Sequence, residues 1–164
     1  LSETTHYDDD VVYRNIRPLD DPSMTVFFAD DSIVARKQIL RTLSAMRVKH
    51  IETINGRMAW NELEKIAAYA HASGVPLTKL VSLVLTDIEM PEMDGYILTK
   101  KIKSDPRFMG IPVIMHSSLS GMSNQQLGKS VGVDEYVPKF EPQKLSEILT
   151  RHLLAARSAV RLPA

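Results

Sequence analysis

Carboxylate, hydroxyl and amine side chains follow four short apolar runs of this sequence, each at the point where the run ends: Asp30, Asp31, Asp87, Ser117 and Lys139. Three carboxylates brought together repel one another and need a cation to stay ionised. A set of oxygen ligands without sulfur favours a hard ion, with Mg²⁺ the natural choice. A carboxylate can also accept a phosphoryl group, and Lys139 and Ser117 would contact its oxygens during transfer.

Each of these residues also has an ordinary structural interpretation. Asp30 and Asp31 could cap a helix that follows them. Asp87 and Ser117 could form turns, and Lys139 could be a solvated surface charge, as most lysines are. The hypothesis of a phosphoryl-transfer site rests on their coincidence, because four separate run ends carry the residue types that one such site requires.

Alternating patterns predict the elements that position these residues. Short apolar runs predict buried strands at 25–29, 48–54, 80–86, 111–116 and 134–137. Apolar spacings of three and four predict helices around 39–46, 63–70, 96–103, 122–131 and 145–153, with 122–131 weakened by Gly121 and Gly128. This alternation predicts an α/β fold with a doubly wound parallel sheet, in which the carboxyl ends of the strands meet at one edge.

Composition limits the function further. The 164 residues include 44% hydrophobic residues, which is enough for one domain with a real core. Twenty basic residues balance twenty acidic ones, so we expect no nucleic-acid partner. Cysteine is absent and no apolar run approaches the ~20 residues of a membrane span, so we expect a cytoplasmic protein without membrane insertion.

The charge is uneven along the chain. Residues 1–23 contain two prolines, two arginines and six acidic residues: Glu3, Asp8, Asp9, Asp10, Asp20 and Asp21. We interpret this segment as a linker or ordered arm that trails from an upstream domain. The globular domain is expected at 24–157, followed by a tail at 158–164.

Several motifs together resemble one known family. They are the Asp30-Asp31 pair, the run DIEMPEMDG at 87–95, Ser117 and Lys139, in this order and at suitable spacing. This pattern resembles the receiver domain of two-component response regulators, from about residue 24 to 154. The resemblance implies a five-stranded CheY-like or flavodoxin-like sheet of order 2-1-3-4-5, and a signalling switch instead of an enzyme.

The resemblance also implies roles for single residues. A histidine kinase would phosphorylate Asp87. Mg²⁺ would be bound by Asp31, Asp87 and the backbone carbonyl of Glu89, with Asp30 reaching it through water. Ser117 would move toward the phosphoryl group, Lys139 would contact it, and Tyr136 would be an aromatic that changes rotamer on activation.

A narrower resemblance is to the receiver of CheV-type chemotaxis proteins. It rests on FADDS at 28–32 with Ala35-Arg36, the run at 87–96, HSSLSG at 116–121 and Lys139-Phe140. In that family a CheW-like coupling domain precedes the receiver. The partners implied are a chemotaxis-type histidine kinase and a chemoreceptor assembly reached through the upstream domain.

Two other functions stay open. One is a receiver-like interaction module that works without phosphorylation, because Phe140 stands where most receivers have a proline after the lysine. The other is a haloacid-dehalogenase-like phosphatase, although Asp87 lacks the second aspartate that such an enzyme needs two residues later. We expect the Lys139–Phe140 bond to be trans, since a cis bond before a non-proline residue costs ~3 kcal/mol. We interpret His116 as a hydrogen-bonded strand residue.

Overall fold

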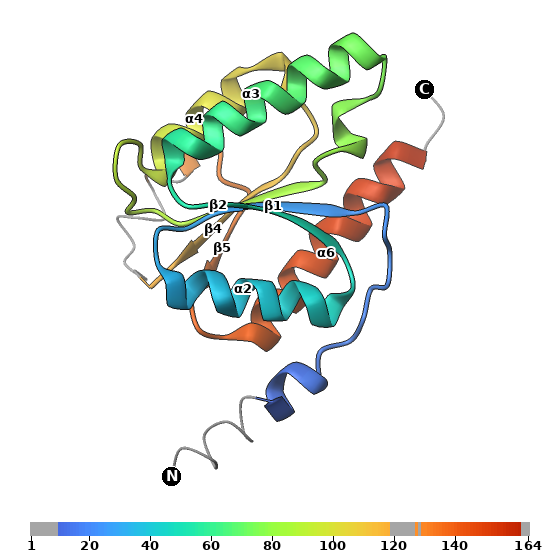
Figure 1. Cartoon of the computed structure of the whole chain (residues 1–164), viewed down its shortest axis with the longest axis vertical. Coiled ribbons are helices and arrows are strands. Elements are labelled where there is room, and N and C mark those ends of the chain that lie inside the picture. The colour runs from blue at the N-terminus through green and yellow to red at the C-terminus, as the bar shows by residue number, and fades with distance from the viewer. Residues whose placement is uncertain (1–9, 119–126, 128, 162–164) are drawn as a thin grey trace.

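A five-stranded parallel sheet forms the centre of the computed structural model (Figure 1), which describes residues 10–118, 127 and 129–161. The strand order is β2-β1-β3-β4-β5, and every neighbouring pair is parallel. The strands are β1 (Thr25–Ala29), β2 (Lys49–Thr53), β3 (Leu83–Thr86), β4 (Val113–Ser117) and β5 (Glu135–Pro138). This confirms the predicted doubly wound sheet and its order 2-1-3-4-5.

Helices cover both faces of the sheet. Figure 1 shows α2 (Ile33–Met46) and α6 (Pro142–Arg161) on one face, and α3 (Gly56–Ser73) and α4 (Gly95–Ser104) on the other. The helix predicted at 122–131 lies mostly outside the described residues. Within that range, the structure describes 127 and 129–131, and these are helical. No helix among the described residues has the length and apolar character needed to cross a membrane.

The core is divided into two layers by the sheet. Alternate residues of a strand point to opposite faces, so Phe28 joins Leu43 of α2 and Leu149 of α6. Phe27 instead joins Leu63 of α3 on the other face. All residues of β1, β3 and β4 are buried, as expected for strands covered on both sides.

Several predicted boundaries differ from the structure, and those of β3 and α3 have a clear local cause. Residues 80–82 do not belong to β3, because the one-turn helix η1 (Leu77–Lys79) precedes them and the Val81 amide donates to the Leu77 carbonyl. Helix α3 begins earlier than its apolar pattern indicated, at Gly56. The Asn55 side chain accepts the Met58 amide there, so Asn55 caps the start of the helix.

The segment before β1 is packed against the domain. Residues 10–14 are helical, and Ile16 is only 3% exposed within the core layer formed with α2 and α6. The amides of Leu19 and Asp20 both donate to the carbonyl of Met46, the last residue of α2. Residues 10–23 are therefore an ordered arm in the described structure, in contact with α2. At the other end of the chain, α6 continues past residue 157 to Arg161.

Candidate functional site

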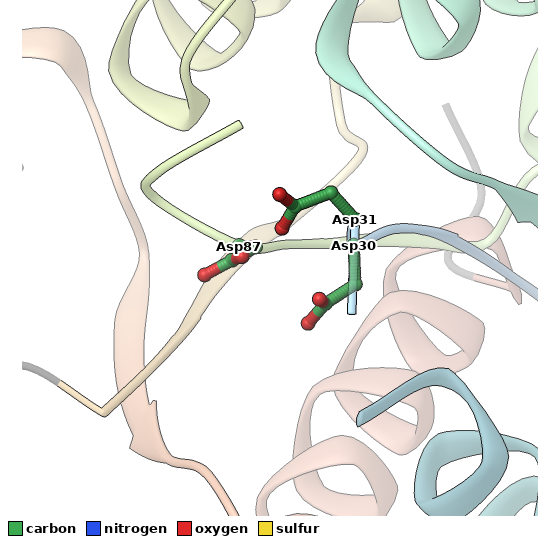
Figure 2. A group of neighbouring side chains, drawn as sticks. All are labelled: Asp30, Asp31 and Asp87. Atoms are coloured by element: carbon green, nitrogen blue, oxygen red, sulfur yellow. The ribbon is translucent and has the colours of Figure 1, made fainter. Parts of the chain in front are cut away.

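Three carboxylates converge at the carboxyl ends of two adjacent strands. Asp30 and Asp31 follow β1, and Asp87 follows β3. One carboxylate oxygen of each residue lies within 4.8 Å of the other two. Figure 2 shows Asp30 and Asp31 leaving the chain on opposite sides, with Asp87 beside them. The convergence predicted from the strand ends is therefore present.

The first loop holds Asp30 without using it as a helix cap. Its Oδ1 accepts the Ser32 amide at 2.9 Å, and the Ser32 hydroxyl accepts the Ala35 amide at the start of α2. Arg36 donates from its guanidinium to the Asp30 carbonyl at 2.8 Å. Because Ser32 caps α2, the capping interpretation of the two aspartates does not apply. Both carboxylates remain available at the site.

The loop after β3 is fixed by the start of α4. The Gly95 amide donates to the Ile88 carbonyl at 2.7 Å, and a Cβ added at Gly95 would lie 2.0 Å from the Asp87 carbonyl oxygen. Only glycine permits this approach. The Asp87 carboxylate itself accepts the Ile88 amide at 2.8 Å. Gly95 therefore sets the distance between α4 and the Asp87 backbone. The residue belongs to the motif at 87–95, but this role was not predicted from the sequence.

Lys139 directly follows the edge strand β5 and connects two of the carboxylates. Its Nζ lies 3.0 Å from Asp30 Oδ2 and 3.2 Å from Asp87 Oδ2, and its side chain is only 9% exposed. The Lys139 amide donates to the Ser117 carbonyl, which holds the base of the side chain at the end of β4. The interpretation of Lys139 as a solvated surface charge is therefore wrong.

The peptide bond after Lys139 is trans, and the next residue has an unusual backbone conformation. The described residues contain no cis peptide bond, so the prediction of a trans Lys139–Phe140 bond is confirmed. Phe140 has a φ of 65°, which is unusual for a residue with a side chain, and it is 52% exposed. Lys139 reaches both carboxylates with this loop geometry.

Charge is unevenly balanced in the cluster. Burial, together with the negative charge of Asp30, raises the pKa of Asp87 from 3.8 to about 6, while Lys139 opposes this shift. Burial disfavours the charge of Lys139, but Asp30 and Asp87 outweigh that effect and raise the pKa of its amine. Three carboxylates share one ammonium group, so the site favours an additional cation.

A small cavity opens over this cluster. It measures about 230 Å³ and is lined by polar residues almost entirely: Asp31, Asp87, Ile88, Glu89, Ser117, Ser118 and Lys139. Asp30 is fully buried beneath it, whereas Asp31 and Glu89 are exposed. The structure thus brings together every residue predicted for metal binding and phosphoryl transfer.

Two further residues from the sequence analysis lie near the cavity without lining it. Tyr136 lies on β5, with its hydroxyl 3.4 Å from the hydroxyl of Tyr96 at the start of α4. His116 is buried on β4, and its Nδ1 has no hydrogen-bond partner among the described residues, so the expected hydrogen bond is missing at that atom. Burial and the charge of Lys139 lower the pKa of His116 to about 3, so its ring is neutral at pH 7.

The donor set fits a hard divalent cation. It consists of the carboxylates of Asp30, Asp31 and Asp87, with no sulfur or nitrogen ligand. The buried Asp30 Oδ2 has an ion-pair partner in Lys139 but no hydrogen bond of good geometry within the part of the chain that the structure describes. An oxygen-only group with excess negative charge suits Mg²⁺ better than a transition metal.

The fold and this site define a class of protein. Residues 26–150 match the response regulator receiver domain family. The chain belongs to that family, whose members are receivers of signalling proteins and not catalytic enzymes. This assignment argues against the phosphatase alternative.

The chain is similar to several chemotaxis proteins. It is 35% identical over 128 residues to the chemotaxis protein CheY1 of Helicobacter pylori, covering 77% of this chain and 94% of that protein. It is also 35% identical over 128 residues to the chemotaxis protein CheV3 of the same organism, covering 78% of this chain. That match spans 40% of CheV3, so the chain covers less than half of this relative.

A solved structure agrees with the fold assignment. Chemotaxis protein CheY4 of Vibrio cholerae superimposes with a TM-score of 0.62 at 25% identity. The match covers 78% of this chain and 97% of that one. The shared part is the receiver, so the fold is CheY-like.

Proposed function

We propose that this receiver accepts a phosphoryl group on Asp87 from a histidine kinase, with Mg²⁺, and that phosphorylation changes its affinity for partners. The observation that carries the proposal is the cluster itself: three carboxylates within 4.8 Å, with Lys139 paired to both Asp30 and Asp87. Each of these residues has an ordinary interpretation alone, but capping and surface solvation do not describe this geometry.

The chemistry assigns a part to each residue around the cavity. An oxygen of Asp87 attacks phosphorus, the bond from phosphorus to the histidine nitrogen breaks, and the imidazole that leaves takes up a proton. Lys139 and Ser117 line the cavity, so their ammonium and hydroxyl groups are the proposed contacts of the phosphoryl oxygens. Mg²⁺ supplies neutralisation of the negative charge that gathers during transfer.

The metal would be held by chain oxygens at the base of the cavity. Asp31, Asp87 and the Glu89 carbonyl are the proposed direct ligands, and Asp30 acts through water. Asp31 and Glu89 line the cavity and Asp30 is buried beneath it, which supports this division. Ser117 and Tyr136 are the proposed switch residues, which is supported by Ser117 lining the cavity and by Tyr136 pairing with Met115, two residues before Ser117 on β4.

The proposed setting is chemotaxis signalling in the cytoplasm. The match to CheV3 covers 40% of the length of CheV3. It supports a receiver that is part of a longer CheV-type protein with an upstream CheW-like domain. A chemotaxis histidine kinase and a chemoreceptor assembly are then its partners. The balanced charge of the chain supports neither a nucleic acid nor a membrane surface as partner.

Phosphotransfer from a kinase tests this function. A purified chemotaxis histidine kinase is autophosphorylated with radiolabelled ATP and mixed with the receiver and Mg²⁺. We expect label to leave the kinase and appear on the wild type, but not on Asp87→Asn. Asp20→Asn is the matched control, because Asp20 is exposed and lies in the arm, and this variant should accept label normally.

Retention of label by the kinase, together with failure to accept phosphoryl groups from small donors, would overturn the proposal. The phosphorylation-independent module would then be the better description. Its main support in the sequence was Phe140, but Lys139 reaches both carboxylates with Phe140 in place, so the geometry favours the phosphoacceptor.

A further inference from the structure

Two tyrosines meet beside the phosphorylation site. The hydroxyl oxygens of Tyr96 and Tyr136 lie 3.4 Å apart, and either can be the donor. Tyr96 is the second residue of α4 and is 8% exposed, whereas Tyr136 belongs to the edge strand β5 and is partly buried. The contact joins two elements that are 40 residues apart in the sequence.

The surroundings of this pair are apolar. Tyr96 packs with Ile88 and Met115 in a small buried cluster, and Tyr136 lies against the same cluster together with Val131 and Val133. Burial, followed by the hydrogen bond to Tyr136, raises the pKa of Tyr96, so its hydroxyl stays protonated across the neutral range. Water competes weakly for hydroxyl groups in such a setting, so loss of a hydrogen bond there lowers stability.

Tyr96 is also tied to the phosphoacceptor through the backbone. It follows Gly95 directly, and Gly95 approaches the Asp87 carbonyl so closely that no side chain fits there. The Gly95 amide is hydrogen bonded to Ile88, the neighbour of Asp87. A displacement of the Asp87 loop therefore moves the first turn of α4, and with it the Tyr96 hydroxyl.

The other end of the contact leads back to the site. Tyr136 lies on β5, three residues before Lys139. It pairs in register with Met115 of β4, which stands two residues before Ser117. The Tyr96–Tyr136 contact thus closes a ring that runs from Asp87 through α4 to β5 and returns to the cavity through Lys139.

We propose that Tyr96 is a positioning residue of the switch: its hydroxyl holds Tyr136 against the start of α4, and the state of the Asp87 loop sets this contact. The proposal rests on the proposed function, because it assigns the regulation of the same site. Tyr96 does not line the cavity over Asp87, so we assign it no part in the transfer itself.

A double-mutant cycle tests the contact without any phosphoryl donor. Unfolding by denaturant is measured for the wild type, Tyr96→Phe, Tyr136→Phe and the double variant of the full chain. We expect the two substitutions to be coupled by roughly 2- to 10-fold in the unfolding equilibrium constant, the range of a net hydrogen bond. The matched control pairs Tyr136→Phe with Tyr69→Phe, because Tyr69 is 61% exposed on α3, and this pair should be additive.

A second measurement follows Tyr136 directly. The chain is labelled with 3-fluorotyrosine, and the fluorine resonance that disappears in Tyr136→Phe is assigned to Tyr136. We expect Tyr96→Phe to shift this resonance before phosphorylation and to alter its change on addition of Mg²⁺ and acetyl phosphate. Intact mass should show that Asp87 in Tyr96→Phe still takes up the phosphoryl group.

The outcomes separate this inference from the proposed function. Additive substitutions, or a Tyr136 resonance that is the same in wild type and Tyr96→Phe, would overturn the role of Tyr96 even if Asp87 is phosphorylated. A wild type that takes up no phosphoryl group would overturn the proposed function, and with it the regulatory role. Coupling of the two tyrosines would then remain as a structural contact only.

Discussion

Burial disfavours the ionised form of the Asp87 carboxyl group. The pKa of this carboxyl is raised to about 6 by burial and by the charge of Asp30, and the single ammonium of Lys139 does not compensate fully. Such a residue destabilises the fold when it is ionised without a cation. The same feature makes it a strong ligand and acceptor when a cation is bound.

The first prediction concerns stability and pH in metal-free buffer. Because the folded-state pKa of Asp87 is about 6 and its ordinary value is 3.8, the folded state binds the proton more tightly. The penalty is therefore complete above pH 6, shrinks as the pH falls toward 4, and is absent below it. At pH 7, Asp87→Asn should raise the free energy of unfolding by up to about 3 kcal/mol.

Denaturant unfolding between pH 4 and 8 measures this effect, with Asp20→Asn as the exposed control. Saturating Mg²⁺ should then stabilise the wild type more than Asp87→Asn, because a ligand of the metal is lost in the variant. Equal free energies of unfolding for wild type and Asp87→Asn at pH 7 without metal would show that ionised Asp87 does not destabilise the fold.

The second prediction concerns Lys139. Lys139→Met leaves the buried carboxylates Asp30 and Asp87 without their cation, and breaking a buried pair in this way costs roughly 3 kcal/mol. We expect this loss in metal-free denaturant unfolding, with partial recovery on addition of Mg²⁺. Lys144→Met, an exposed position on α6, should change stability little. A loss of the same size in both variants would contradict the pairing.

At the scale of elements, short loops after the strands position the residues of the site. The loop after β3 returns to α4 so tightly that Gly95 touches the Asp87 carbonyl. Helix propensity alone predicts that Gly95→Ala would stabilise α4 by up to ~1 kcal/mol. The close approach reverses that expectation.

The third prediction concerns this contact. A Cβ at residue 95 would lie 2.0 Å from backbone, which must move, so Gly95→Ala should lower the free energy of unfolding by about 1–3 kcal/mol. It should also slow phosphoryl uptake, since the Asp87 loop is displaced. Lys100→Ala, on the exposed face of α4, is the control and should do neither. A stabilised Gly95→Ala variant with normal uptake would contradict the role of the close approach.

The arm is the element that the sequence described least. Its composition resembles a linker, yet Ile16 is buried in the main core layer, and Arg41 of α2 pairs with Asp10 at 2.7 Å and lies over the Tyr13 ring. Ile16 stands between Asn15 and Arg17 and belongs to no periodic apolar pattern, so its burial could not be predicted. The packing supports an arm that is part of the folded domain.

The fourth prediction tests that packing. Ile16→Ala should lower the free energy of unfolding by about 2–4 kcal/mol, as expected when a buried isoleucine is truncated. Val12→Ala is the matched control in the arm, because Val12 is 36% exposed, and it should cost much less. Equal small losses in both variants, measured by denaturant unfolding, would mean that the arm is not held as the structure shows.

For the whole molecule, the features that strand ends determine were predictable from the sequence, and those that depend on side-chain packing were not. Buried runs place Asp30, Asp31 and Asp87 at one edge, and a parallel sheet brings them together. The contact between Tyr96 and Tyr136 depends on how the start of α4 is placed relative to β5, which no local pattern encodes. Whether His116 Nδ1 finds a partner likewise depends on neighbours from several elements, and none of the described residues supplies one.

Phosphoryl uptake from acetyl phosphate with Mg²⁺, followed by intact mass, tests the central claim most directly. We predict one added phosphoryl mass on the wild type and on Asp20→Asn, lost when Mg²⁺ is chelated and absent in Asp87→Asn. Uptake by Asp87→Asn equal to that of the wild type would place the phosphoryl group elsewhere. No uptake by a folded wild type, from acetyl phosphate or from a histidine kinase, would contradict the phosphoacceptor function.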